Sequence, residues 1–412
     1  MTDGTDFRAA LLLAAIRATG QVAPPRDTTV TARAAQAAAH AGRTLLELRG
    51  PAGTLPTLRL GWPTGSAPND EHLADQLPPA LPPVATLVWA LCVKAAWPDP
   101  SVPLYPGLPF SAARIEEACS NLGADPKRVT SALERVLPEH ALIVRAGRLL
   151  HLGPAAATLP DPVVAALRRG HHRLPEVPPE APPPTQASDA PMPPLDLGPA
   201  DTDPAPETGT DQIARSTVTA LEAARGPLPP RHVTALADPH TKARIEQILQ
   251  GTGRNLLHTP SGSWTTGYPD RVADALATAG IGTLPPTERA VLALVLIHTV
   301  ALPRARGRHT HPHWNTTAHP VTANELARNR ALSRTEIDKA LRTLRATGMV
   351  DIAGGQGQYV PGQALQRLSP ARAAALWEDL ILAGRPGGHL ARAITERRAT
   401  HHADTLIPGE SQ

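Results

Sequence analysis

The most regular pattern of apolar and polar positions lies in segment 334–347. Apolar side chains recur there at the 3.6-residue spacing of an α-helix, at Ile337, Ala340, Leu341 and Leu344. Ser333 precedes the segment, and Glu336 follows that serine by three residues, which is the capping-box pattern. Gly348 is typical of a helix C-terminus. We therefore predict an amphipathic helix with one buried stripe and one polar face.

The segments on either side of this helix extend the pattern. A short helix is predicted over 322–329, and an apolar helix over 287–302 precedes it. Downstream, 349–353 and 358–361 are predicted strands that bracket Gly354-Gly355-Gln356-Gly357. This arrangement predicts a two-stranded hairpin with a glycine-rich tip, so the expected order is helix, short helix, amphipathic helix and hairpin.

The chain also carries an internal repeat. Gly4-Thr5-Asp6 recurs as Gly209-Thr210-Asp211, and Pro24-Pro25-Arg26 recurs as Pro229-Pro230-Arg231, each pair 205 positions apart. The same order of elements is predicted in the first half, at 79–170. A second candidate module of the same type is predicted upstream of each of these two. A direct duplication indicates a module, and modules repeated on one chain usually bind rather than catalyse.

We predict a mainly α fold with small β-hairpins (α+β), built from tandem modules in two duplicated halves. The predicted modules are 1–65, 79–170, 209–280 and 284–385, followed by a polar C-terminal helix or tail at 386–412. Segment 174–208 contains twelve prolines, seven acidic residues and no Lys or Arg, so it is predicted to be an extended, disordered linker. Cleavage in this linker is expected to release two folded halves.

The acidic linker conceals a basic balance in the rest of the chain. The whole chain has a formal charge of +3 and the linker −7, so the remaining residues carry +10. From Arg304 to Arg345 there are nine basic residues against three acidic ones. Such a surplus favours polyanionic partners, nucleic acid first, and an ordinary solvated helix face is the alternative explanation.

The helix, short helix, helix and hairpin at 284–361 resemble the winged helix-turn-helix superfamily. In that family the helix that corresponds to 334–347 enters the DNA major groove, and the hairpin tip touches the flanking backbone. The resemblance therefore implies a DNA-binding surface on the polar face of this helix. Arg and Lys there suit the role because they neutralise phosphates, and Arg can bond guanine through two hydrogen bonds.

The residues expected to contact DNA come mainly from the fourth module, with smaller sets in the second and third. In the fourth module they are Arg328, Arg330, Arg334, Thr335, Asp338, Lys339, Arg342, Arg345 and, at the hairpin tip, Gly355 and Gln356. In the second and third modules they are Lys127, Arg128, Lys242 and Arg244. The helix at 127–135 is less basic than its counterpart, so the fourth module is expected to be the main reader.

Other chemistry is weakly indicated. Four histidines cluster in one predicted loop, at His309, His311, His313 and His319. No Cys or acid lies close to them in sequence, so a loop that contacts phosphate or solvent is favoured over a metal site. Cys92 and Cys119 are predicted to be buried thiols in a reducing compartment. Because no nucleophile–base pair, Walker sequence or dinucleotide fingerprint is recognisable, we predict no enzyme, no catalytic residue, no metal and no cofactor.

The protein is expected to be cytoplasmic and associated with the nucleoid. The longest apolar stretch, 290–302, has thirteen residues, whereas a membrane span needs ~20. The first six residues are acidic where a signal peptide needs positive charge.

The leading functional hypothesis is double-stranded DNA binding for transcriptional regulation, or for plasmid-type replication or partition control. The alternative is a winged-helix scaffold of a chromosome-organising or other multi-subunit complex, in which DNA affinity is incidental. A protein partner or a homodimer fits either hypothesis. A sensor with a small-molecule pocket has no positive support in the sequence.

Overall fold

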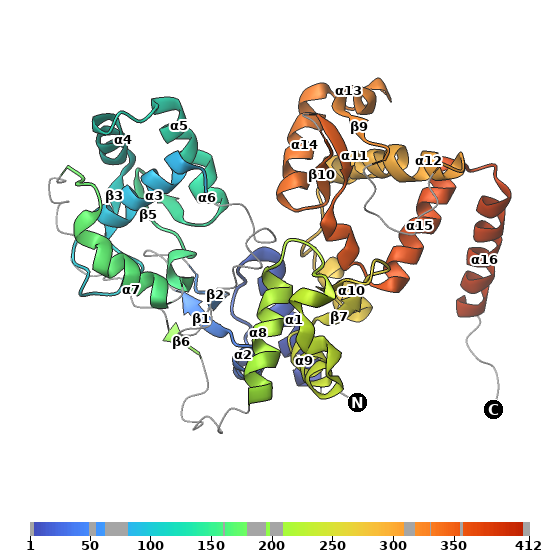
Figure 1. The fold of residues 1–412 in the computed structure, drawn as a ribbon, viewed down its shortest axis with the longest axis horizontal. Helices are drawn as coiled ribbons and strands as arrows, with labels where there is room; N and C mark the ends of the chain where they lie inside the picture. Colours follow the sequence, from blue (N-terminus) through green and yellow to red (C-terminus); the bar gives the residue numbers. More distant parts are fainter. Residues whose placement is uncertain are drawn as a thin grey trace. The chain divides into compact units, whose positions relative to one another are not determined.

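The computed structural model describes residues 4–48, 55–61, 81–159, 161–178, 195–197, 209–308, 318–329, 331–354 and 357–406. The protein is mainly helical, with small antiparallel sheets, as the sequence predicts (Figure 1). The described residues form two compact units. The first holds the described residues up to Ala220 together with Ala237–Gly253, and the second holds Leu221–Leu236 and the described residues from Arg254 onward.

These units differ from the two halves expected from the repeat. The helix α9 (Pro239–Gly251) of the second repeat belongs to the first unit, where it packs against α1 (Gly4–Thr19) and α2 (Thr28–His40). A repeat pattern cannot reveal this, because it reports similarity between segments and carries no information on which segments pack together.

The N-terminal part of the first unit is a helical pair with a small sheet. After α1 and α2, the antiparallel strands β1 (Thr44–Leu48) and β2 (Thr57–Gly61) pair in register. A third strand, β6 (Leu195–Asp196), pairs with β1 on its other edge.

This third strand corrects part of the predicted linker. Within 174–208, residues 195–197 are ordered against β1, and the Leu197 N–H donates to Leu45 O at 3.0 Å. Residues 174–178 are also held, because the Arg114 guanidinium donates to Pro178 O at 2.5 Å and Lys94 pairs with Glu176 at 3.3 Å. The unpaired backbone edge of β1 explains the strand, since an open edge readily accepts an extended segment. The remaining residues of 174–208, 179–194 and 198–208, lie outside the described structure.

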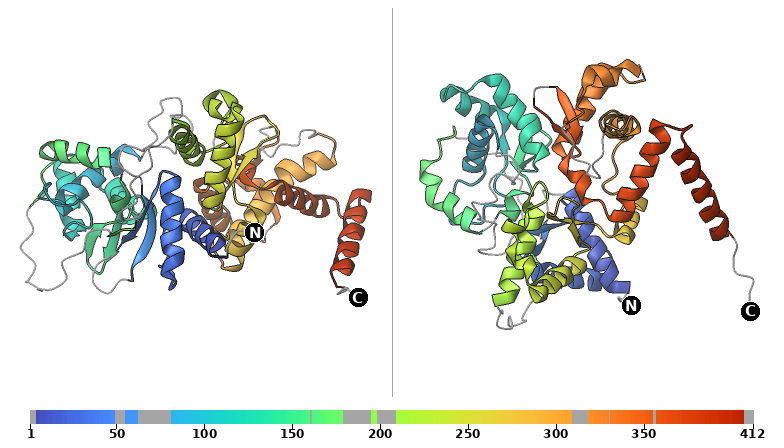
Figure 2. Two further views of the ribbon diagram at one scale, coloured as in Figure 1. Left: turned by 90° about the horizontal axis from the view of Figure 1, so that it is seen from below. Right: turned by 45° about the vertical axis from the view of Figure 1, so that its right-hand side comes forward.

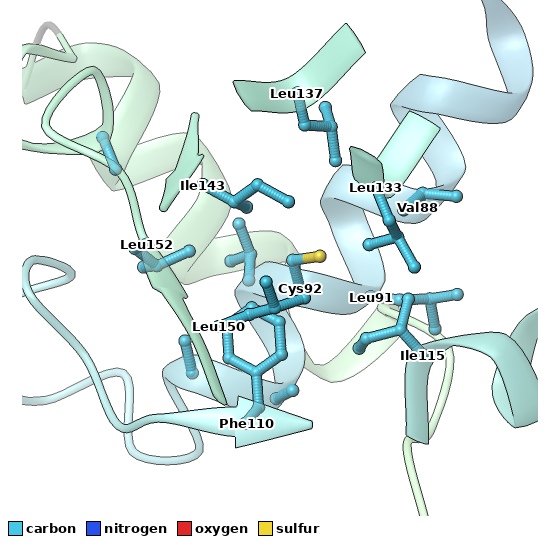
Figure 3. Close-up of a cluster of buried hydrophobic side chains, with 14 of the residues drawn as sticks. Val88, Leu91, Cys92, Phe110, Ile115, Leu133, Leu137, Ile143, Leu150 and Leu152 are labelled. Atoms are coloured by element: carbon cyan, nitrogen blue, oxygen red, sulfur yellow. The ribbon is translucent and has the colours of Figure 1, made fainter. Parts of the chain in front are cut away.

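The second predicted module forms another part of the first unit. Its elements, in chain order, are α3 (Pro83–Ala96), β3 (Phe110–Ser111), α4 (Ala112–Asn121), α5 (Pro126–Ser131), a π-helical turn (Ala132–Val136), α6 (Leu137–Glu139), β4 (Ile143–Ala146), β5 (Leu149–Leu152) and α7 (Asp161–Gly170). The sheet order is β3-β5-β4. Figure 3 shows its core, in which Cys92, Phe110 and Leu133 lie among fully buried aliphatic side chains.

The second unit holds the fourth predicted module and the segments packed on it. Its elements are β7 (Asn255–His258), β8 (Trp264–Gly267), α10 (Asp270–Thr278), α11 (Pro286–Leu296), a π-helical turn (Ile297–Ala301), α12 (Leu302–Ala305), β9 (Val321–Thr322), α13 (Ala323–Leu326), α14 (Arg334–Ala346), β10 (Val350–Ile352), β11 (Gln358–Pro361), α15 (Pro370–Gly384) and α16 (His389–Leu406). Strands β10, β11 and β9 form an antiparallel sheet in that order.

The segments 83–152 and 286–361 therefore share one order of elements and one sheet order. They also share local contacts. The Gly153 N–H donates to Leu142 O at 2.7 Å, and at the equivalent place the Gly362 N–H donates to Met349 O at 2.9 Å. A side chain on either glycine would meet a backbone oxygen at 2.1 Å, Ala141 O or Gly348 O, so both sites require glycine.

The segments 4–61 and 209–267 share contacts as well. Arg33 pairs with Asp6 at 2.6 Å and donates to Gln36 at 2.7 Å. Arg244 pairs with Asp211 at 2.7 Å and donates to Gln247 at 2.8 Å. Two isolated bridges also correspond, Val22 with Leu58 and Leu228 with Trp264. The same polar partners therefore recur at matched positions of α1 and α2 and of α8 (Gly209–Ala223) and α9.

Within the first unit these two helix pairs meet through reciprocal contacts. A side chain on Gly253 would lie 2.6 Å from Ala10 O, and one on Gly42 would lie 3.7 Å from the Arg215 Cβ. Gly42 corresponds to Gly253 and Ala10 to Arg215, so each repeat presents the same surface to the other. This is the pattern of an isologous interface, which two identical subunits form about a twofold axis.

One helical run resembles a membrane span in length and composition. Pro286–Ala305 has a mean hydropathy of 1.2 and is the single run in the described residues that is long and apolar enough to cross a membrane. In the second unit this run is partly buried, and Val291, Val295 and Val300 are fully buried on its inner side.

Candidate nucleic-acid interface

Helix α14 forms where the sequence predicts it, with the predicted buried stripe. Ile337, Ala340, Leu341 and Leu344 are all buried. They pack against Val291 and Val295 of α11 in one hydrophobic cluster. The Ser333 hydroxyl accepts from the Glu336 N–H, and the Glu336 carboxylate accepts from the Ser333 N–H at 2.8 Å, which completes the capping box. The cap and the stripe together fix which face of α14 points outward.

The outward face of α14 carries most of the predicted contact residues. Exposed side chains on it are Arg334, Thr335, Lys339, Arg342 and Arg345. Among the described residues, Lys339 and Arg345 have no ion-pair partner, and Arg342 donates only to the backbone oxygen of Asp338, at 3.3 Å. Three cationic groups are therefore available to an anionic ligand along this face.

Arg334 is held in place by two neighbours. Its Nε pairs with the Asp338 carboxylate at 2.9 Å, four residues along the helix, and its Nη1 donates to Asn324 on α13. Asp338 therefore offsets the charge of Arg334 and orients its guanidinium. The sequence did not indicate Asn324, because the bond joins residues on two different helices and no local pattern marks it.

The turn between α13 and α14 places another cation beside this face. The predicted short helix over 322–329 forms as α13 followed by a 3₁₀ turn, Ala327–Asn329, and Arg328 on that turn is exposed. A second capping box at Thr322 holds the pKa of Glu325 below its ordinary value, mainly through the Thr322 N–H and with a smaller effect of Arg328. Arg330 lies outside the described residues.

The hairpin that follows α14 forms as β10 and β11. Gly354 and Gly357, next to its tip, have positive φ angles of 64° and 84°, which glycine adopts without strain. The two predicted contact residues at the tip, Gly355 and Gln356, lie outside the described residues.

The residues of the second module that are expected to contact DNA, Lys127 and Arg128, are exposed at the start of α5. Asp125 caps this helix through the Lys127 N–H, at 3.0 Å, and its carboxylate lies 3.7 Å from Arg128. Lys127 itself has no ion-pair partner among the described residues. This face offers fewer available cations than α14, as the sequence predicts.

The candidates in the third module are engaged in contacts within the fold. Lys242 lies 4.0 Å from Glu246 on the same helix. Arg244 is half-buried and pairs with Asp211, which joins α9 to α8. The structure therefore gives Arg244 a role in packing, and the sequence concealed this role because Asp211 lies 33 positions away.

Two arginines beside the β7–β8 hairpin, the buried Arg254 and the half-buried Arg367, were not predicted. Arg254 donates to the Thr266 hydroxyl at 2.5 Å and its guanidinium lies 4.7 Å from the centre of the Tyr268 ring. Arg367 donates to Ala224 O at 2.5 Å, and burial together with Arg254 lowers its pKa to about 10. Arg254 corresponds to Arg43, which donates to Gly61 O at 2.9 Å, so an arginine joins the two strands of the hairpin in both repeats.

The histidines and cysteines of this chain are the residues that could bind a metal or, for the cysteines, react as thiols. Among the described residues, no cluster of three or more His, Cys, Asp or Glu residues could hold a metal ion. His319 is described, whereas His309, His311 and His313 lie outside the described residues. Cys92 and Cys119 are both buried free thiols, and burial raises the pKa of each.

Comparison with known proteins adds no family. No protein-family model matches this chain, and no curated protein matches it either.

Proposed function

We propose that this protein binds double-stranded DNA through tandem winged-helix modules and acts as a transcriptional regulator in the cytoplasm, on the nucleoid. The observation that carries the proposal is the outward face of α14. Lys339, Arg342 and Arg345 have no ion-pair partner there among the described residues, and they lie on a capped helix that is followed by a hairpin. Replication or partition control belongs to the same physical class and requires the same surface. The proposed activity is binding, and it involves no catalytic group.

The order of helices and strands in 286–361 and the topology of their sheet support this proposal. A short strand, two helices and a hairpin whose second strand pairs with the first strand form the arrangement β10-β11-β9. In winged helices the second helix of the pair enters the major groove with its N-terminal residues nearest the base edges. By this comparison Arg334 and Thr335 contact bases, and the three available cations contact phosphates.

We assign different roles to the first three modules. The α5 face of the second module is a weaker reader, with Lys127 as its available cation. The helix pairs α1–α2 and α8–α9 serve as pairing surfaces, because they already pack against each other within the first unit. This pairing favours a protein-interaction role for the first and third modules, whereas α14 is the DNA-binding surface.

The experiment removes the three available charges together. Lys339, Arg342 and Arg345 are changed to Gln, which preserves helix propensity, and duplex binding is measured by fluorescence anisotropy between ~50 and 200 mM salt. We expect affinity to fall about 10- to 100-fold at the lower salt, and the log–log salt slope to decrease by between about two and three. The control variant Arg289→Gln/Arg392→Gln removes exposed charges from α11 and α16, and it should bind as the parent does.

The alternative is a winged-helix scaffold with incidental DNA affinity. It predicts weak binding to any duplex and no effect of the three α14 substitutions beyond that of the control. If the triple variant retains its circular dichroism spectrum and its full salt slope, the α14 face is an ordinary solvated surface and the scaffold replaces the DNA-binding proposal.

A further inference from the structure

An apolar cavity lies at the C-terminal end of the second unit, between α12, α15 and α16. Its volume is about 180 Å³. Its apolar lining includes Ala301, Trp377, Leu380 and Ile381. Figure 2 shows α15 and α16 as successive helices at this end of the chain. The two helices contact each other, and Arg397 and Arg398 of α16 pair with Glu378 of α15.

The polar groups around this cavity all carry, or can carry, positive charge. Arg304 lies with its guanidinium 4.3 Å from the centre of the Trp377 ring, and Arg385 and His389 also line the cavity. Of the described residues that line it, none is acidic. Glu378 and Asp379, the acids of α15, are paired with Arg397 and Arg398 instead. Apolar walls with a few convergent polar groups are the usual make-up of a small-molecule site.

We propose that this cavity binds a small apolar monocarboxylate, of the size of benzoate or a branched short-chain acid. The cavity is open to solvent on one side, because Ala305, Arg385 and His389 are exposed, and its 180 Å³ accommodates one ring or a branched chain whose carboxylate lies at the open side. The hydrocarbon part lies against Trp377 and Leu380, and the carboxylate accepts hydrogen bonds from Arg304 and Arg385. Arginine suits this role because its planar guanidinium can hold a carboxylate by two parallel bonds.

The site connects directly to α14. Ala301 and Arg304 belong to the same continuous helical run as Val291 and Val295, which pack against α14. A ligand that holds α12 against α15 therefore stabilises the helical run Pro286–Ala305, on which the proposed DNA-binding helix α14 packs. This regulatory effect rests on the proposed function, whereas binding of the carboxylate does not.

Isothermal titration calorimetry on the full chain tests the site with benzoate, phenylacetate and 3-methylbutanoate as probes. We expect a Kd on the order of 1 mM or tighter for at least one probe, which is usual for ligands with so few atoms. Benzyl alcohol, which has the ring without the charge, should bind at least about 10-fold more weakly than benzoate. Equal binding of the neutral analogue would remove the role of the arginines.

Three variants test whether the probes bind in this cavity. Ala305→Phe introduces a bulky side chain at an exposed lining position and should abolish binding, while Arg304→Gln and Arg385→Gln should each weaken it at least about 10-fold. Arg392→Gln, on the exposed side of α16, is the matched control and should bind as the parent does. Thermal unfolding without ligand checks that each variant folds.

The outcomes separate this site from the proposed function. Absence of binding by all three probes up to about 10 mM, or binding that the lining variants leave unchanged, overturns the site. Binding that the variants abolish supports it, whether or not the protein binds DNA. If DNA binding is established, a benzoate-dependent change in duplex affinity that Ala305→Phe removes supports the regulatory link, and no change refutes that link alone.

Discussion

At the scale of single residues, two glycines close the hairpins of the second and fourth modules. Gly153 and Gly362 each follow the last hairpin strand, where the chain passes directly over the backbone that leads out of the preceding helix. Neither position has room for a side chain. Hydrophobic patterning did not reveal this requirement, because it arises from the contact of two backbone segments and involves no apolar side chain.

We expect Gly362→Ala to destabilise the second unit. The added Cβ would lie 2.1 Å from Gly348 O and 2.7 Å from the Val350 nitrogen, so the backbone must shift at a cost of about 1–3 kcal/mol or more. Urea unfolding followed by circular dichroism measures the change. Gly387→Ala is the control, since a Cβ added there would meet nothing within 4 Å, and its unfolding should be almost unchanged. Equal stability of the two variants would contradict the close approach.

At the scale of elements, local sequence signals defined α14 well. The predicted helix over 334–347 corresponds to α14, with the capping box and the buried stripe in place. Local signals of this kind depend on residues three or four positions apart. The strand β6 and the bond between Arg334 and Asn324 depend instead on partners in other elements, so the sequence did not predict them.

The ion pair on α14 leads to a prediction about selectivity. Asp338 offsets Arg334 and adds a negative charge to the proposed DNA-reading face. Asp338→Asn should free Arg334 and remove that charge, so affinity for random duplex should rise several-fold while the preference for a selected site falls. Fluorescence anisotropy on a selected and a random duplex, each at two salt concentrations, measures both effects. The matched variant Glu396→Gln, on α16, should alter neither. A loss of affinity for both duplexes would show that the oriented Arg334 matters more than the charge.

At the scale of the whole molecule, the reciprocal contacts in the first unit change the expected behaviour of the two repeats. Sequence similarity suggested separable halves joined by 174–208. The structure instead packs α9 of the second repeat against α1 and α2 of the first, and the Arg215 guanidinium donates to His40 O at 3.2 Å across this contact. Because each repeat satisfies the matching surface of the other, the chain contains within itself the kind of interface that usually joins two subunits.

This pairing predicts that a cut between the repeats leaves them associated. A protease site inserted at 203 separates the chain into two fragments, and we expect them to elute together in size-exclusion chromatography. Ala14 is fully buried and its Cβ would lie 3.2 Å from a Cβ at Gly253, so Ala14→Arg places a charged side chain in the contact and should let the fragments separate after cleavage. Ala393→Arg, at an exposed position on α16, is the control and should leave them together. If the uncut parent shows normal stability but its cleaved fragments elute apart, the repeats are independent modules and the isologous contact contributes little to their association.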